Sequence, residues 1–158
     1  MKNKYQDAVI TYICNKRSYE IIKNNPNISK IYIFEKDDYR RLWAESKLKL
    51  VKELRALITS IKADRYDIVF DMSLGYIYSL ILFLFAGIPI RIGFHYRKRG
   101  KFLTHKLTIE GFNEKHVIEY YLDLGAMIGL DTSDKEMELV VPQEEQAWAD
   151  AYLLKESV

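Results

Sequence analysis

Two groups of basic side chains follow strand-like runs in this chain, and their chemistry suits the binding of anions. Arg40 and Arg41, with Trp43 beside them, come shortly after the apolar run 31–34. The second group follows residues 90–94 and comprises Arg97, Lys98, Arg99 and Lys101. Guanidinium groups bind phosphate or carboxylate oxygens in pairs, so both groups are candidate anion sites. Solvated surface charge is the alternative for each of them.

A third candidate is Asp71, which ends the β-branched and aromatic run 66–71, with Ser73 two residues later. A carboxylate at the end of a strand can orient a sugar hydroxyl or a cationic partner. It can equally cap the helix that follows, because Asp is a favoured capping residue. Both roles stay open for Asp71 on sequence grounds.

Motifs for several other kinds of chemistry are missing from the sequence. There is no Gly-rich phosphate loop and no Asp-x-Asp pair. His95, His105 and His116 have no metal-ligand spacing, and Cys14 is the single cysteine. Cys14 ends an apolar run, so we expect a buried, unreactive thiol. The sequence therefore predicts no bound metal and no cofactor.

Strand-like and helix-like segments alternate along the chain. The predicted strands are 8–14, 28–34, 66–71 and 90–94, with shorter ones at 105–109 and 137–141. The predicted helices are 18–22 with Ser18 as N-cap, 39–63, 76–86, 117–128 and 143–155. This order predicts an α/β fold, an open parallel sheet with helices on both faces.

Ligands of such sheets bind at the carboxyl ends of the strands. That edge is predicted to carry Asn15, Glu35, residues 71–73 and the loop after Phe94.

Composition limits the class of protein. The chain has 158 residues, 49% hydrophobic and 29% charged, which excludes intrinsic disorder. A formal charge of +2 is too small to indicate bulk nucleic-acid binding. Residues 72–90 carry no charge, but Ser73, Gly75, Ser79, Gly87 and Pro89 interrupt them. A buried helix is favoured there over a membrane span, with contact at a membrane surface as a third interpretation.

Several runs, taken in order, resemble the N-terminal half of glycosyltransferase family 9, the lipopolysaccharide heptosyltransferase family. They are NKYQDAVITY at 3–12, NNPNISKIY at 24–32, KADRYDIVFD at 62–71, RIGF at 91–94, THK at 104–106 and HVIEYYLDL at 116–124. Met72-Ser73-Leu74 departs from the family's pattern after Asp71. The resemblance covers residues 3 to about 130 and continues weakly beyond.

The resemblance implies one Rossmann-like half of a two-domain GT-B enzyme. Residues 1–141 would be the acceptor domain without its first strand, and 142–158 a helix leading toward a missing nucleotide-sugar domain. The reaction implied is an inverting, metal-independent transfer of a heptose or related sugar from a nucleotide sugar to a lipopolysaccharide inner-core acceptor. We expect the general base to lie upstream of Met1, so that no catalytic residue is assigned and the chain alone is inactive.

The resemblance also implies how the candidate residues act. The acceptor-binding set would be Arg40, Arg41, Asp71, Ser73, Arg97, Arg99 and Lys101. The partners would be an acidic glycolipid, a nucleotide sugar held only by the missing domain, and no nucleic acid. The location would be the cytoplasm, with peripheral contact at the inner face of the cell membrane. The alternative is an anion- or nucleic-acid-binding α/β module that uses the same basic residues.

Overall fold

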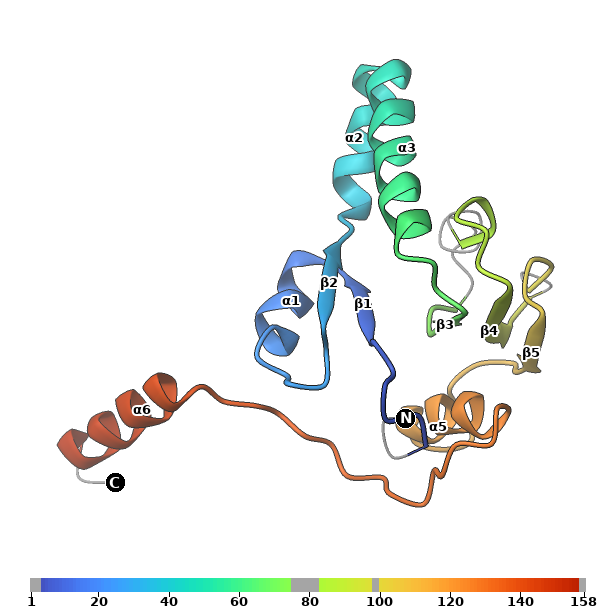
Figure 1. Ribbon diagram of the computed structural model, residues 1–158. Helices are drawn as coiled ribbons and strands as arrows, with labels where there is room; N and C mark the ends of the chain where they lie inside the picture. The colour runs from blue at the N-terminus through green and yellow to red at the C-terminus, as the bar shows by residue number, and fades with distance from the viewer. Residues whose placement is uncertain (1–3, 75–82, 98–99, 157–158) are drawn as a thin grey trace. The chain divides into compact units, whose positions relative to one another are not determined.

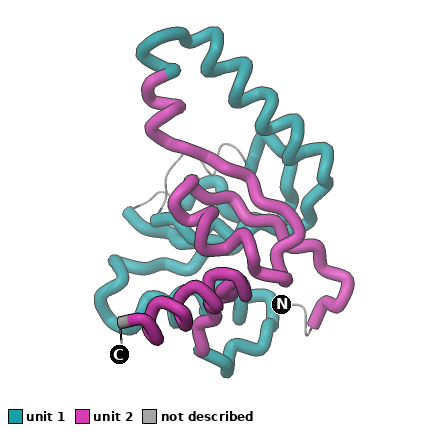
Figure 2. The backbone as a smooth tube through the Cα atoms, turned by 90° about the vertical axis from the view of Figure 1, so that its left-hand side faces the viewer, with its two compact units in different colours: residues 1, 42–135 teal, residues 2–41, 136–158 magenta. Residues whose placement is uncertain are grey.

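A computed structural model gives the structure of the chain and describes residues 4–74, 83–97 and 100–156 (Figure 1). Strands and helices alternate along most of these residues, and every strand pairing is parallel. The predicted α/β class with parallel strands is therefore confirmed. The contacts within the chain divide it into two compact units (Figure 2). Unit 1 is Leu42–Lys135 together with Met1, and unit 2 is Lys2–Arg41 with Glu136–Val158.

Unit 2 contains a two-stranded parallel sheet. Strand β1 (Thr11–Cys14) pairs with β2 (Lys30–Ile33), with Thr11 opposite Lys30 and Cys14 opposite Ile33. Helix α1 (Lys16–Ile22) is the crossover between them. Its N-cap is Asn15, whose side chain accepts a hydrogen bond from the backbone of Ser18 at 2.8 Å. The prediction of Ser18 as the cap was wrong, because Asn15 supplies the oxygen three residues earlier.

Unit 1 contains a three-stranded parallel sheet in the order β3 (Ile68–Asp71), β4 (Ile90–His95), β5 (His105–Thr108). The sequence predicts one open sheet, whereas the strands of the described residues form two hydrogen-bonded sheets. Strand β3 begins the second sheet after a long helical segment instead of extending the first.

The best-buried cluster in unit 1 lies between its sheet and helix α5 (Val117–Ala126). Ile92 and Phe94 of β4 pack with Tyr120 and Leu124 of α5, and all four are buried. Phe112 adds an edge contact to Phe94, at 5.5 Å between ring centroids. Aromatic pairs of this geometry add to the stability that apolar burial provides.

Gly93 allows β3 and β4 to lie close together. A Cβ atom at this position would be 2.9 Å from the backbone oxygen of Asp71. No side chain fits at that distance unless the backbone shifts. The glycine in the RIGF run therefore sets the spacing of the strand that ends on Asp71.

The predicted helix 39–63 is two helices in the structure. Helix α2 (Lys36–Glu45) and helix α3 (Lys47–Ala63) are separated by Ser46, whose backbone is extended. The Ser46 hydroxyl accepts from the backbone N–H of Lys49 at 3.4 Å and so caps α3. The helical character of the segment is confirmed, but the serine cap inside it was missed.

Two further predictions concern less regular segments. Residues 137–141 form no strand, and their three large apolar side chains, Met137, Leu139 and Val141, are exposed. Alternating apolar residues do not make a strand when nothing covers one face. Helix α6 (Gln143–Glu156) follows, as predicted.

Of the predicted helix 76–86, residues 76–82 lie outside the described part of the chain. Among the residues that follow, Phe83 and Ala86 are buried while Leu84 and Phe85 are exposed, so the buried character holds for one side only. Across the described residues, none of the helices combines the length and the apolar character that crossing a bilayer requires.

Candidate functional site: the carboxyl ends of the parallel strands

Unit 2 has an open pocket of about 500 Å³ where its two strands end. Asn15, Lys16 and Arg17 come from the segment after β1. Glu35, Asp37 and Asp38 come from the segment after β2 and from the first turn of α2. The strand ends meet here because the pairing is parallel, which confirms the predicted placement of Asn15 and Glu35.

Hydrogen bonds across the strand ends hold the pocket in shape. The backbone N–H of Lys16 donates to Glu35 Oε1 at 2.5 Å, which ties the two segments together. The Lys16 ammonium lies 3.9 Å from Asp38 Oδ2. These charged groups are exposed, so the ion pair adds little stability, while the bond from Lys16 to Glu35 orients a carboxylate at the pocket wall.

The pocket combines two cations with three carboxylates. Ammonium and guanidinium groups bind phosphate oxygens, and carboxylates accept hydrogen bonds from hydroxyl groups. A ligand that carries both hydroxyl groups and an anionic group matches this lining. The arrangement therefore suits a charged carbohydrate better than a simple anion.

Cys14 lies at the end of β1 and is half-buried instead of buried as predicted. Burial, and then the negative charge of Glu35, raise the pKa of its thiol. Both effects disfavour the thiolate, which is the nucleophilic form. The prediction of an unreactive thiol is consistent with this raised pKa.

Arg40 and Arg41 lie in α2, directly after the segment that lines the pocket. Arg41 binds Asp38, with 3.0 Å between Nη2 and Oδ1. Arg41 is thereby linked to a pocket residue, and Arg40 is exposed on the same helix. The structure places these two arginines in unit 2, and the other described acceptor candidates, Asp71, Ser73, Arg97 and Lys101, in unit 1.

Asp71 and Ser73 form a joined pair at the end of β3. Asp71 is only 5% exposed, and its Oδ1 accepts from the Ser73 backbone at 3.0 Å and from the Ser73 hydroxyl at 2.6 Å. Buried polar groups need hydrogen-bond partners, and Ser73 provides two of them for this carboxyl group. The two residues that the sequence singled out here are thus brought together.

Gly100, which follows β4 in the chain, contacts the last residue of that strand. The backbone N–H of Gly100 donates to His95 Nδ1 at 3.2 Å, and a Cβ at Gly100 would lie 2.8 Å from that nitrogen. Arg97 has a positive φ of 45° and lies over the ring of Tyr96 at 5.0 Å. Arg97 and Lys101 are exposed near the end of β4, and Arg99 lies outside the described residues.

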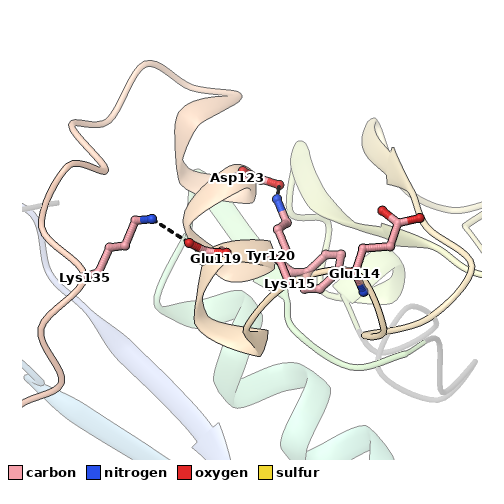
Figure 3. Close-up of polar contacts among 6 residues, drawn as sticks. All are labelled: Glu114, Lys115, Glu119, Tyr120, Asp123 and Lys135. Atoms are coloured by element: carbon pink, nitrogen blue, oxygen red, sulfur yellow. Dashed lines mark hydrogen bonds and ion pairs between the residues drawn. The ribbon is translucent and has the colours of Figure 1, made fainter.

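Helix α5 is held by the contacts drawn in Figure 3. The hydroxyl of buried Tyr120 accepts from the Glu114 backbone at 3.0 Å, and Lys115 pairs with Asp123. Lys135 lies 2.5 Å from Glu119, and this partner lowers the pKa of the Glu119 carboxyl. His116 caps the helix through Nδ1. His116 and Glu119 therefore have structural partners, as their position on a helix suggests.

Sequence reasoning missed Lys16, Arg17, Asp37 and Asp38. Their position next to Asn15 and Glu35 was the available signal, because side chains that flank two adjacent parallel strand ends share one edge. Among the described residues, no three His, Cys, Asp or Glu side chains converge in a way that could hold a metal ion.

The fold is similar to that of two solved glycosyltransferase structures. The chain is similar to the crystal structure of a glycosyl transferase family 9 protein from Veillonella parvula DSM 2008, at a TM-score of 0.73 and 17% identity. The match covers 99% of this chain and 43% of that one. The structure of Escherichia coli ADP-heptose lps heptosyltransferase II matches at a TM-score of 0.60 and 20% identity, over 96% of this chain and 43% of that one.

The sequence comparisons agree with the structural ones. Lipopolysaccharide heptosyltransferase 3 of Escherichia coli is 23% identical over 146 residues, which is 90% of this chain and 40% of that protein. The chain thus spans about two fifths of the length of the relatives it matches. The model of glycosyltransferase family 9 (heptosyltransferase) matches residues 54–156, well over half of the sequence. By this match the chain, with its parallel α/β fold, is a member of glycosyltransferase family 9.

Proposed function

We propose that this chain is the acceptor-binding part of a transferase that moves a heptose, or a related sugar, from a nucleotide sugar to an acidic inner-core lipopolysaccharide acceptor. The observation that carries the proposal is the pocket of unit 2, where Lys16 and Arg17 lie with Glu35 and Asp38. An inner-core sugar presents hydroxyl groups and anionic groups together, which this lining can bind in pairs.

The other candidate residues extend the same binding chemistry. Arg40 and Arg41 would hold acidic groups of the acceptor beside the pocket. Asp71, oriented by Ser73, would accept a sugar hydroxyl in unit 1. The exposed cations Arg97 and Lys101 after β4 would hold a further anionic group. We propose the same role for Arg99, which lies outside the described residues.

The reaction itself needs more than acceptor binding. An inverting transfer without a metal requires a base that deprotonates the acceptor hydroxyl and positive charge that stabilises the departing diphosphate. We assign neither role to a residue of this chain, and we place the nucleotide sugar on a second domain, the donor domain. Residues 1–141 would form the acceptor domain and 142–158 the helix that connects the two. The enzyme would work in the cytoplasm, at the inner face of the membrane.

Titration with a lipid-free, phosphorylated inner-core oligosaccharide tests the acceptor site. Isothermal calorimetry should show binding, and the double variant R40Q/R41Q should bind about tenfold more weakly, because charge-assisted hydrogen bonds are lost. Lys49→Gln is a control for the loss of positive charge, since it removes one charge from an exposed helical position outside the proposed site. Unchanged affinity in R40Q/R41Q, or no binding at all, contradicts the proposal.

Two further measurements complete the test. The chain alone, given a nucleotide-heptose and the lipid acceptor, should release no nucleotide diphosphate. Turnover would contradict the proposal that this chain binds the acceptor and a second domain binds the nucleotide sugar. Affinity for random oligonucleotides that falls steeply with salt would instead identify a nucleic-acid-binding module.

A further inference from the structure

One exposed side of helix α3 combines apolar and basic residues without an acidic one. The residues on this side, here called the basic face of α3, are Lys47, Leu48, Val51, Lys52 and Arg55. Leu48 is 85% exposed and Val51 50% exposed, which is unusual for aliphatic residues of a helix that also has a buried side. An exposed apolar patch with charged neighbours indicates an interaction surface.

The helical repeat places these residues on one side and the core residues on another. Leu48, Val51, Lys52 and Arg55 follow the spacing of three, four and seven residues that shares one face of a helix. Leu50 and Ile61, on the core side, are buried. Glu53, the acidic residue of α3, lies about 160° around the axis from the middle of the basic face at 100° per residue.

An aromatic side chain stands next to the face. Trp43, in the last turn of α2, is 61% exposed, and the Lys47 ammonium lies 5.3 Å from the centre of its ring. Tryptophan is enriched where proteins meet the headgroup region of a bilayer, because its ring is apolar and its N–H is polar. Residues 43–55, all within unit 1, thus carry three large apolar side chains that are exposed, together with the exposed cations of the face.

We propose that the basic face of α3, with Trp43, binds the surface of an anionic phospholipid bilayer. Lys47, Lys52 and Arg55 would contact lipid phosphates. Leu48, Val51 and Trp43 would enter the boundary between headgroups and acyl chains, with the helix lying parallel to the membrane. Charge complementarity selects this partner, because a basic face without an acid attracts an anionic surface. The inference deepens the proposed function and rests on it, since the acceptor proposed there is a lipid embedded in such a surface.

Vesicle flotation tests this surface with the full chain. We expect binding to vesicles of phosphatidylglycerol and phosphatidylcholine, and much weaker binding to phosphatidylcholine alone. Arg55→Gln should weaken binding about fivefold, the effect expected for one cation at an anionic surface. Leu48→Gln should weaken it by a similar factor through lost apolar contact. Lys49→Gln removes a charge from the same helix about 120° away from Arg55 and should have a clearly smaller effect.

Three outcomes overturn the proposal. The first is equal binding to both kinds of vesicle, or none. The second is an equal loss in Lys49→Gln and Arg55→Gln, which would show attraction by diffuse charge. The third is a lipid-free dimer that Leu48→Gln dissociates in light-scattering measurements, which would assign the face to a second copy of the chain.

The oligosaccharide titration separates this failure from that of the proposed function. Arg55→Gln and Leu48→Gln should bind the lipid-free oligosaccharide as the original chain does. If vesicle binding fails while the oligosaccharide binds, only the membrane surface is wrong. If the oligosaccharide fails to bind while vesicle binding persists, the acceptor site is wrong.

Discussion

The two units differ in how they use their side chains. In unit 1, residues of β4 and α5 such as Ile92 and Leu124 are fully buried. In unit 2, no described residue is buried, and its strand ends carry a pocket lined by charged groups. Burial of apolar surface is the main source of folding free energy. Unit 1 therefore provides most of the stability, and unit 2 carries the pocket that we propose binds the acceptor.

This difference in burial explains why polar and charged side chains lie at the exposed strand ends. A buried position tolerates few changes of volume or charge, whereas an exposed strand end accepts polar side chains at little cost. Asp71 is the exception, since it is buried in unit 1 and accepts two hydrogen bonds from Ser73. Its carboxyl group thus belongs to the local structure as well as to the proposed site.

The largest expected effect tests whether stability resides in unit 1. Leu124→Ala should lower the free energy of unfolding by about 2–5 kcal/mol, because it leaves a cavity in a fully buried position. Ile31→Ala, at a half-buried position of β2, should cost about 1 kcal/mol. Urea denaturation followed by circular dichroism measures both. Equal costs would show that unit 2 packs as tightly as unit 1.

A medium effect tests the close approach of β3 and β4. Gly93→Ala should lower the free energy of unfolding by about 1–3 kcal/mol, since the new methyl group would press on the Asp71 backbone. Gly87→Ala is the comparison, with a φ of 76° and no atom within 4 Å of its Cβ. It should cost about 1 kcal/mol through backbone strain alone. A smaller cost at Gly93 than at Gly87 would mean that the strands separate easily.

The smallest effect concerns pH and the exposed contacts of unit 1. Lys135 lowers the pKa of Glu119 in the folded state, so the pair contributes stability above the ordinary pKa of a glutamate, about 4.3. That contribution is lost as the pH falls through the lowered folded-state pKa. Melting curves between about pH 6 and pH 3 should show a slightly steeper loss in the original chain than in Glu119→Gln. Identical slopes would show that the pair adds nothing measurable.

Much of the fold was predictable from local pattern. The apolar runs ending at Cys14, Phe34, Asp71 and Phe94 each contain a strand, because β-branched and aromatic residues cluster in them. The break at Ser46 was not found, because the apolar spacing continues across it and only the capping serine marks it. The run 137–141 shows the opposite error, where an apolar pattern has no covering partner.

The candidate site was predictable in position more than in composition. We could predict Asn15, Glu35 and Asp71 as strand-end residues from the sequence, because ligands of parallel sheets bind at the carboxyl ends of the strands. The bond from the Lys16 backbone to Glu35 depends on the register of β1 against β2, which the sequence does not reveal. The exposed basic face of α3 was also missed, since helical spacing alone does not tell which apolar residues are covered.

The Asn15 carboxamide has a consequence for ligand selection. Its oxygen is already engaged by the Ser18 amide, which holds the start of α1 in place. That oxygen has a second lone pair, so the carboxamide can still accept a hydrogen bond while its NH₂ group donates. Hydroxyl groups both donate and accept, and they can therefore use both ends of this amide. A ligand rich in hydroxyl groups thus matches this part of the pocket without disturbing the cap of the helix.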